Sequence, residues 1–102
     1  MQPIEIERLE TVLQAYEGRT PYIHVEVTPG AFVRNVTAAI EQAYVRGSGP
    51  YRVALRLKGD GWIRAEGLTH MAEEPGRLLL AGHDELGRLT CGLQLSTERF
   101  EA

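Results

Sequence analysis

The sequence of 102 residues has few of the side chains that most often carry catalysis or bind metals. Its one cysteine, Cys91, excludes an intrachain disulfide and a multi-cysteine metal site. Its three histidines are widely separated, and no two have the short spacing of a zinc motif. Its two serines form no nucleophile elbow. Pro50 follows Gly47–Gly49 and has no N–H to offer a phosphate. We therefore predict no catalytic constellation, no cofactor and no metal.

Long apolar runs are also missing. None approaches the roughly 18 residues that a membrane helix needs, and residues 1–5 lack the basic and apolar layout of a signal peptide. We therefore expect a cytoplasmic protein with no membrane contact. Eleven basic against 14 acidic residues give a net charge of −3, which argues against nucleic-acid binding. Basic residues nevertheless dominate residues 34–64, where six stand against two acidic ones.

Hydrophobic residues make up 43% and charged residues 25% of the chain, as in ordinary globular proteins. This length supports one core, so we predict a single domain over residues 1–102. Apolar residues recur at helical spacing near the N-terminus and predict a helix over about residues 3–16. Pro3 suits its first position and Gly18 its end.

From residue 21 to residue 96 the pattern is β-rich, with an apolar residue at every second position in several stretches. In residues 51–66, a three-residue loop at 59–61 keeps the apolar side chains on one face. That loop pairs Lys58 with Trp62 and Arg56 with Arg64, and Gly61 supplies its left-handed residue.

A last hairpin is predicted from residues 78–82 and 88–95, with Leu80 facing Cys91 and Leu78 facing Leu93. Residues 97–102 read as a frayed tail. Residues 31–46 fit either a helix or two strands with a turn at 41–43, because periodicity alone does not separate them.

Six stretches, in order along most of the chain, resemble the YojF-like family of small uncharacterised proteins from Gram-positive bacteria. They are residues 3–8, 22–24, 49–53, 61–63, 65–69 and 76–84. The resemblance implies a compact, mostly antiparallel β domain with an N-terminal helix. It favours a hairpin over residues 31–46. Genes of this family often lie beside a zinc-dependent N-deacetylase of the bacillithiol pathway, which implies a deacetylase either as a protein partner or as an enzyme of a shared pathway.

Together these observations predict a mainly β fold, a small antiparallel β-barrel or bent sheet with one N-terminal helix. A small β domain protects its sheet edges by closing or by pairing, so we also expect a homodimer.

The predicted hairpin places Arg56, Lys58, Trp62 and Arg64 on one solvent-facing side, with Glu66 diagonal to Arg56. Two arginines opposite one another are unfavourable unless something negative covers them, and Lys58 beside Trp62 allows a cation–π contact. The patch is either a site for an anionic small molecule or an acidic partner, or a surface neutralised by acidic residues, with Trp62 at a dimer contact. The neutralised surface is favoured.

The other candidates are histidines and the cysteine. His83 and Asp84 are a possible polar site, although Asp84 more simply caps its own turn. Convergence of four residues on a metal is conceivable but is not required by their spacing; these are His24, Glu26, His70 and Glu73. Cys91 alternates with leucines and reads as a core residue.

Two functions follow from these observations. The first is a non-catalytic binding or accessory protein acting with a deacetylase. The alternative is a small enzyme or metal-dependent catalyst that uses His24, His70, His83 and nearby acids. Convergence of the three histidines would discriminate between the two functions.

Overall fold

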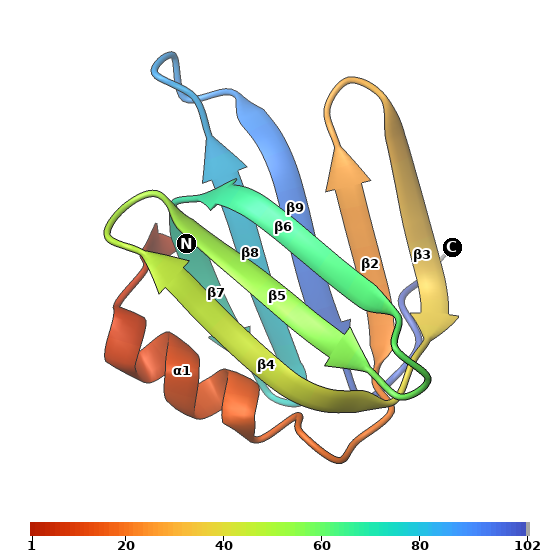
Figure 1. Ribbon diagram of the computed structural model, residues 1–102. Coiled ribbons are helices and arrows are strands. Elements are labelled where there is room, and N and C mark those ends of the chain that lie inside the picture. Colours follow the sequence, from red (N-terminus) through yellow and green to blue (C-terminus); the bar gives the residue numbers. More distant parts are fainter. Residues whose placement is uncertain (102) are drawn as a thin grey trace.

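The chain folds into two antiparallel β-sheets that pack face to face, with one helix along one side (Figure 1). We describe it from a computed structural model, which covers residues 1–101. Its elements in chain order are β1 (Gln2–Pro3), α1 (Ile6–Gln14), β2 (Tyr22–Val27), β3 (Ala31–Thr37), β4 (Ile40–Gly47), β5 (Tyr51–Leu57), β6 (Trp62–Leu68), β7 (His70–Glu74), β8 (Arg77–His83) and β9 (Leu89–Ser96). The large sheet has the order β1-β7-β8-β9-β2-β3, and the small sheet has the order β4-β5-β6.

The core lies between the two sheets and under the helix. In Figure 1, β6 crosses over β8 and β9, and α1 runs beside β4. The largest fully buried side chains come from both sheets and from α1; they are Leu9, Leu13, Ile23, Ile40, Val53, Leu55, Leu68, Met71, Leu78, Leu80, Leu93 and Leu95. The predicted mainly β fold of bent antiparallel sheets with one helix is confirmed. Within residues 1–101 the sheets stay separate and do not close into a barrel.

The helix begins later than predicted. Pro3 lies in β1 and pairs with His70, while Glu5 is the N-cap residue of α1. A proline suits the edge of a sheet as well as the first turn of a helix, because its missing N–H costs nothing at either place. Leu9, Leu13 and Tyr16 face the core as their spacing predicts.

Residues 31–46 form strands, as the family resemblance implies, but they do not form a hairpin. β3 pairs with β2 in the large sheet, whereas β4 pairs with β5 in the small one. The chain passes between the sheets at Ala38–Ala39, and the predicted turn at 41–43 lies inside β4. Ile40 directs this crossing, because it is 1% exposed and its backbone bonds to Gly18 and Arg19 after the helix.

The two predicted hairpins exist, but each pairs two residues away from the predicted register. Arg56 faces Trp62, with a connection over residues 58–61 whose left-handed residues are Gly59 and Asp60 rather than Gly61. Leu80 faces Leu93, not Cys91. A shift of two residues leaves every side chain on its predicted face, because side chains alternate with a period of two. The buried faces are therefore as predicted.

The C-terminal segment is held in place, so the predicted frayed tail is wrong for residues 97–101. Phe100 is 8% exposed, and its ring lies under the guanidinium of Arg77. The side chain of Asn35 on β3 both donates to the Phe100 carbonyl (2.9 Å) and accepts from the Phe100 N–H (2.7 Å). These two hydrogen bonds hold the C-terminal segment against the edge of the large sheet.

Candidate functional site

The outer face of the small sheet gathers arginines and aromatic rings. Cross-strand pairing puts Tyr44, Ala54 and Arg64 in one row over β4, β5 and β6. In the next row along the strands, Arg46 lies directly opposite Arg52. Like charges in directly opposed positions of a sheet are destabilising. The face therefore carries a repulsion between Arg46 and Arg52.

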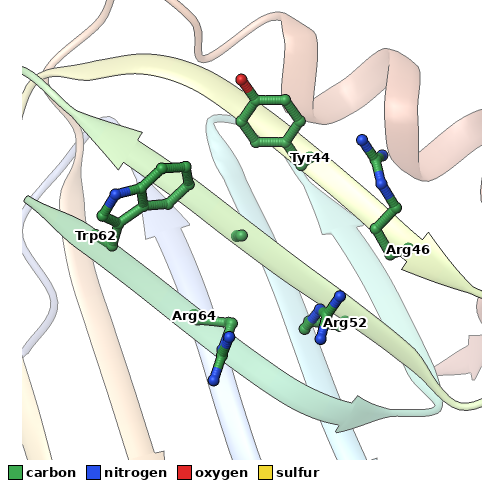
Figure 2. A pocket seen from close by; sticks show the side chains of 6 residues that line it. Tyr44, Arg46, Arg52, Trp62 and Arg64 are labelled. Carbon is green, nitrogen blue, oxygen red and sulfur yellow. The ribbon is translucent and has the colours of Figure 1, made fainter. Parts of the chain in front are cut away.

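These rows surround a hollow, which we call the basic hollow. Its volume is about 510 Å³, and its lining consists of Tyr44, Arg46, Arg52, Ala54, Trp62 and Arg64. Figure 2 shows Tyr44 and Trp62 on one side of it and the three arginines around the other. The two rings have centroids 6.1 Å apart and are tilted by 31°. Ala54 has the smallest side chain of the lining, so it leaves the space between the larger groups open.

The arginines of the basic hollow are only partly neutralised. The Glu66 carboxylate lies 3.3 Å from Arg52 and 3.9 Å from Arg64, so one carboxylate serves two guanidinium groups. Arg46 donates to the carbonyl of Val45 (2.9 Å) and lies over the Tyr44 ring at 5.5 Å. Within residues 1–101, Arg46 forms no ion pair. The hollow thus carries a net positive charge.

Three of the four residues of the predicted patch lie together on the outer face, and the fourth, Lys58, does not. Arg56, Trp62 and Arg64 share the outer face, but Arg56 faces Trp62 and forms an ion pair with Glu41 at 3.5 Å. Lys58 lies in the turn after β5, away from the predicted pairing with Trp62.

Sequence reasoning missed Tyr44, Arg46 and Arg52 as members of the site. Their alternation with buried Val45 and Val53 was a usable signal. It needed the knowledge that β4 and β5 are neighbours, and the break at residues 47–50 gave no loop register to test this.

Asp84 caps its own turn, as the simpler interpretation predicts. Its Oδ1 accepts from the N–H groups of Leu86 and Arg88, both at 2.9 Å, and its Oδ2 lies 2.8 Å from Arg88 Nε. The hydrogen bond from the Arg88 N–H is the main reason why the pKa of Asp84 lies below its usual range. The carboxylate is thus committed to its loop, and no hydrogen bond joins it to the His83 ring within the described residues.

The three histidines do not converge. His70 and His83 meet edge to face with ring centroids 5.1 Å apart, and the Thr69 hydroxyl lies 2.7 Å from Nδ1 of His70. His24 lies on β2, with β8 and β9 between it and β7, a distance of about 14 Å at normal strand spacing. It is 4% exposed and bonds to Glu26 at 3.1 Å.

The four residues considered for a metal fall on two separate strands, two on β2 and two on β7. Glu73 pairs with Arg8 on α1, at 2.6 Å, instead of approaching a histidine. Within residues 1–101, no group of three histidine, cysteine or acidic residues is arranged to hold a metal ion. The convergence that the spacing allowed but did not require is not found among these residues, because β8 and β9 lie between the His24–Glu26 pair on β2 and the residues His70 and Glu73 on β7.

Cys91 lies on the inner face of β9 and is half-buried. Its thiol donates to the carbonyl of Glu66 on β6 at 3.0 Å. Burial raises the pKa of the Cys91 thiol, which disfavours the reactive thiolate at neutral pH. The residue thus helps to join β6 to β9, in keeping with its interpretation as a packing residue.

Fold and site together define a small two-sheet antiparallel β protein with one helix and a basic, aromatic hollow on its small sheet. The family model described as "Protein of unknown function (DUF1806)" matches residues 3–100, and the chain belongs to this family. The "Uncharacterized protein YojF" of Bacillus subtilis (strain 168) is 39% identical, over 98% of each chain. The resemblance read from the sequence is thereby confirmed.

A solved structure has the same fold. The "Crystal Structure of Bacillus subtilis YojF protein" matches with a TM-score of 0.91 and 40% identity, covering 99% of this chain and 97% of that chain. No helix within residues 1–101 has the length and apolar character needed to cross a membrane.

Proposed function

We propose that this protein is a non-catalytic binding protein whose basic hollow takes an anionic ligand. The observation that carries the proposal is the direct opposition of Arg46 and Arg52 beside Arg64, with one carboxylate, Glu66, shared by Arg52 and Arg64. An anion above the hollow would relieve the repulsion and accept hydrogen bonds from several guanidinium groups. Such charge-assisted bonds are the strong ones in protein recognition.

The exposure of Trp62 supports the same proposal. Its side chain is 56% exposed although the chain buries most of its other large apolar residues. A tryptophan left on a surface beside arginines is typical of binding sites, where aromatic and arginine side chains contribute most of the affinity. The competing interpretation, a surface neutralised by its own acids, accounts for Arg56 through Glu41 but leaves Arg46 unpaired within residues 1–101.

The proposal includes the accessory role that the family resemblance implies. In it, the protein acts with an N-deacetylase of bacillithiol metabolism and presents the basic hollow to a shared anionic metabolite or to an acidic surface of that enzyme. Native mass spectrometry of the protein isolated gently from its host tests this part. A heteromeric mass that matches a deacetylase supports it, and a bare homo-oligomer in repeated preparations overturns it.

The catalytic alternative has lost its main support. It required His24, His70 and His83 to act together, and strand order places His24 away from the other two.

Trp62 gives a direct test of anion binding because it is the sole tryptophan of the chain and lines the hollow. Its fluorescence is followed during titration with ADP, citrate and inorganic pyrophosphate. We expect a saturable change with at least one of these anions. The double variant Arg46→Glu/Arg52→Glu should bind that anion weaker by about tenfold or more, because it replaces two attractive charges by repulsive ones.

The matched control is Arg19→Glu/Arg99→Glu, which makes the same charge change at two exposed positions outside the small sheet. It should bind the anion like the wild-type protein, and circular dichroism should show that both double variants fold. Absence of saturation with all three anions, or equal losses in the two double variants, would refute binding at the hollow.

A further inference from the structure

Two aromatic rings lie side by side at one end of the basic hollow. Tyr44 and Trp62 come from β4 and β6, and their centroids are 6.1 Å apart with a tilt of only 31° (Figure 2). A planar group can stack on an exposed ring at about 3.5 Å, the van der Waals contact distance. Trp62 is 56% exposed, so its ring is accessible for such stacking without a change in the core.

The charges of the hollow indicate what a ring stacked there carries. Arg46, Arg52 and Arg64 line the space beside the rings, and Glu66 offsets one of their three positive charges. Two positive charges remain, which match a dianion. Guanidinium groups bind phosphate oxygens in pairs of parallel hydrogen bonds, and the arginines here come from all three strands of the sheet. A phosphate group beside the stacked ring would satisfy them.

We propose that the ligand of the basic hollow is a phosphorylated compound with a planar aromatic ring, of the size of a nucleoside mono- or diphosphate. This inference rests on the proposed function and narrows it. The ring stacks on the exposed face of Trp62, beside Tyr44, and the phosphate lies among the three arginines. The volume of about 510 Å³ lies within the range of small-molecule sites.

The test compares a ligand with its two parts. ADP, adenosine and inorganic pyrophosphate are each titrated against the full chain, with Trp62 fluorescence as the readout. We expect ADP to bind at least about tenfold more tightly than either part, because stacking and charge pairing act together. Quenching of Trp62 by both ADP and adenosine would accompany this, since the ring lies against the indole.

Each contrary result would overturn a specific part of the proposal. If pyrophosphate binds as tightly as ADP, the aromatic class is wrong while anion binding at the hollow stands. If adenosine binds as tightly as ADP, both the phosphate class and the anionic ligand of the proposed function fall. A single-stranded oligonucleotide of ten bases tests the other source of the same chemistry. Tighter binding of that strand than of ADP would overturn a small-molecule ligand.

A variant of Trp62 separates the contribution of ring stacking to ligand affinity from that of charge. Trp62→Leu keeps an apolar side chain but removes the ring, so it should lose the preference for ADP and bind pyrophosphate as the wild type does, measured by calorimetry. Phe32→Leu makes the matched change at an aromatic residue that is 62% exposed on the large sheet, and it should keep the preference. An unchanged ratio of ADP to pyrophosphate affinity in Trp62→Leu would contradict stacking.

Discussion

Gly82 marks a place where the two sheets come into backbone contact. It lies on the inner face of β8, where an added Cβ would overlap the carbonyl oxygen of Gly67 on β6 and approach Thr90 Oγ1 to 3.1 Å. Backbone atoms cannot move aside as a flexible side chain does. The close packing of the small sheet on the large one therefore depends on the absence of a side chain at this position.

Gly82→Ala should consequently lower the free energy of unfolding by about 1–3 kcal/mol, the usual cost of overpacking a core. Urea denaturation of the variant and the wild type measures the difference. Gly92→Ala is the control, because a Cβ there would make an ordinary 3.6 Å contact with the Glu26 side chain. We expect the Gly92→Ala variant to lose less than half as much stability, and equal losses would show that close approach at Gly82 is not the cause.

At the scale of the elements, the sequence predicts well which face of a strand is buried, and poorly which strands pair. Alternation of apolar residues identified the buried sides of β5, β6, β8 and β9 correctly, although both registers differ by two residues. Alternation reports which way a side chain points, and it carries no information about which strand lies alongside. For this reason the sequence could not show that β3 and β4 pair with different strands. The membership of Tyr44 and Arg46 in the basic hollow depends on that pairing, so it could not be predicted either.

The fastening of the tail escaped prediction for a related reason, since Asn35 and Phe100 are remote in the chain. Asn35→Ala should release the segment after β9, because both hydrogen bonds to Phe100 are lost. Hydrogen exchange at the Phe100 amide should become faster by about tenfold or more, which corresponds to the loss of a bond worth about 1.4 kcal/mol. Thr37→Ala, at an exposed position on the same strand, should leave the Phe100 amide protected.

At the scale of the whole molecule, the homodimer predicted from the sequence remains to be tested, and β3 offers a place to test it. This strand is an outer edge of the large sheet, and Phe32, Val33 and Val36 on it are 62%, 48% and 46% exposed. Exposed apolar edge strands pair readily with another strand, and a lysine on such an edge opposes pairing. An antiparallel pair of β3 strands would place the same residues of both copies in contact.

Light scattering should therefore give twice the chain mass of 11.3 kDa for the wild type. Val36→Lys should shift the mass to that of one chain. Leu86→Lys adds the same charge at a loop residue that is 76% exposed, and it should leave the dimer intact. A wild-type protein with the mass of one chain would refute the homodimer.

The basic hollow also gives the molecule an electrical polarity. The chain as a whole carries a net charge of −3, whereas the outer face of the small sheet is positive. The remaining surface must therefore be more negative than the net charge alone indicates. An approaching anion would be turned away from most of the protein and guided to one face, so its encounter rate should fall as salt screens that field. Polarity of this kind sets the direction of approach before any contact forms.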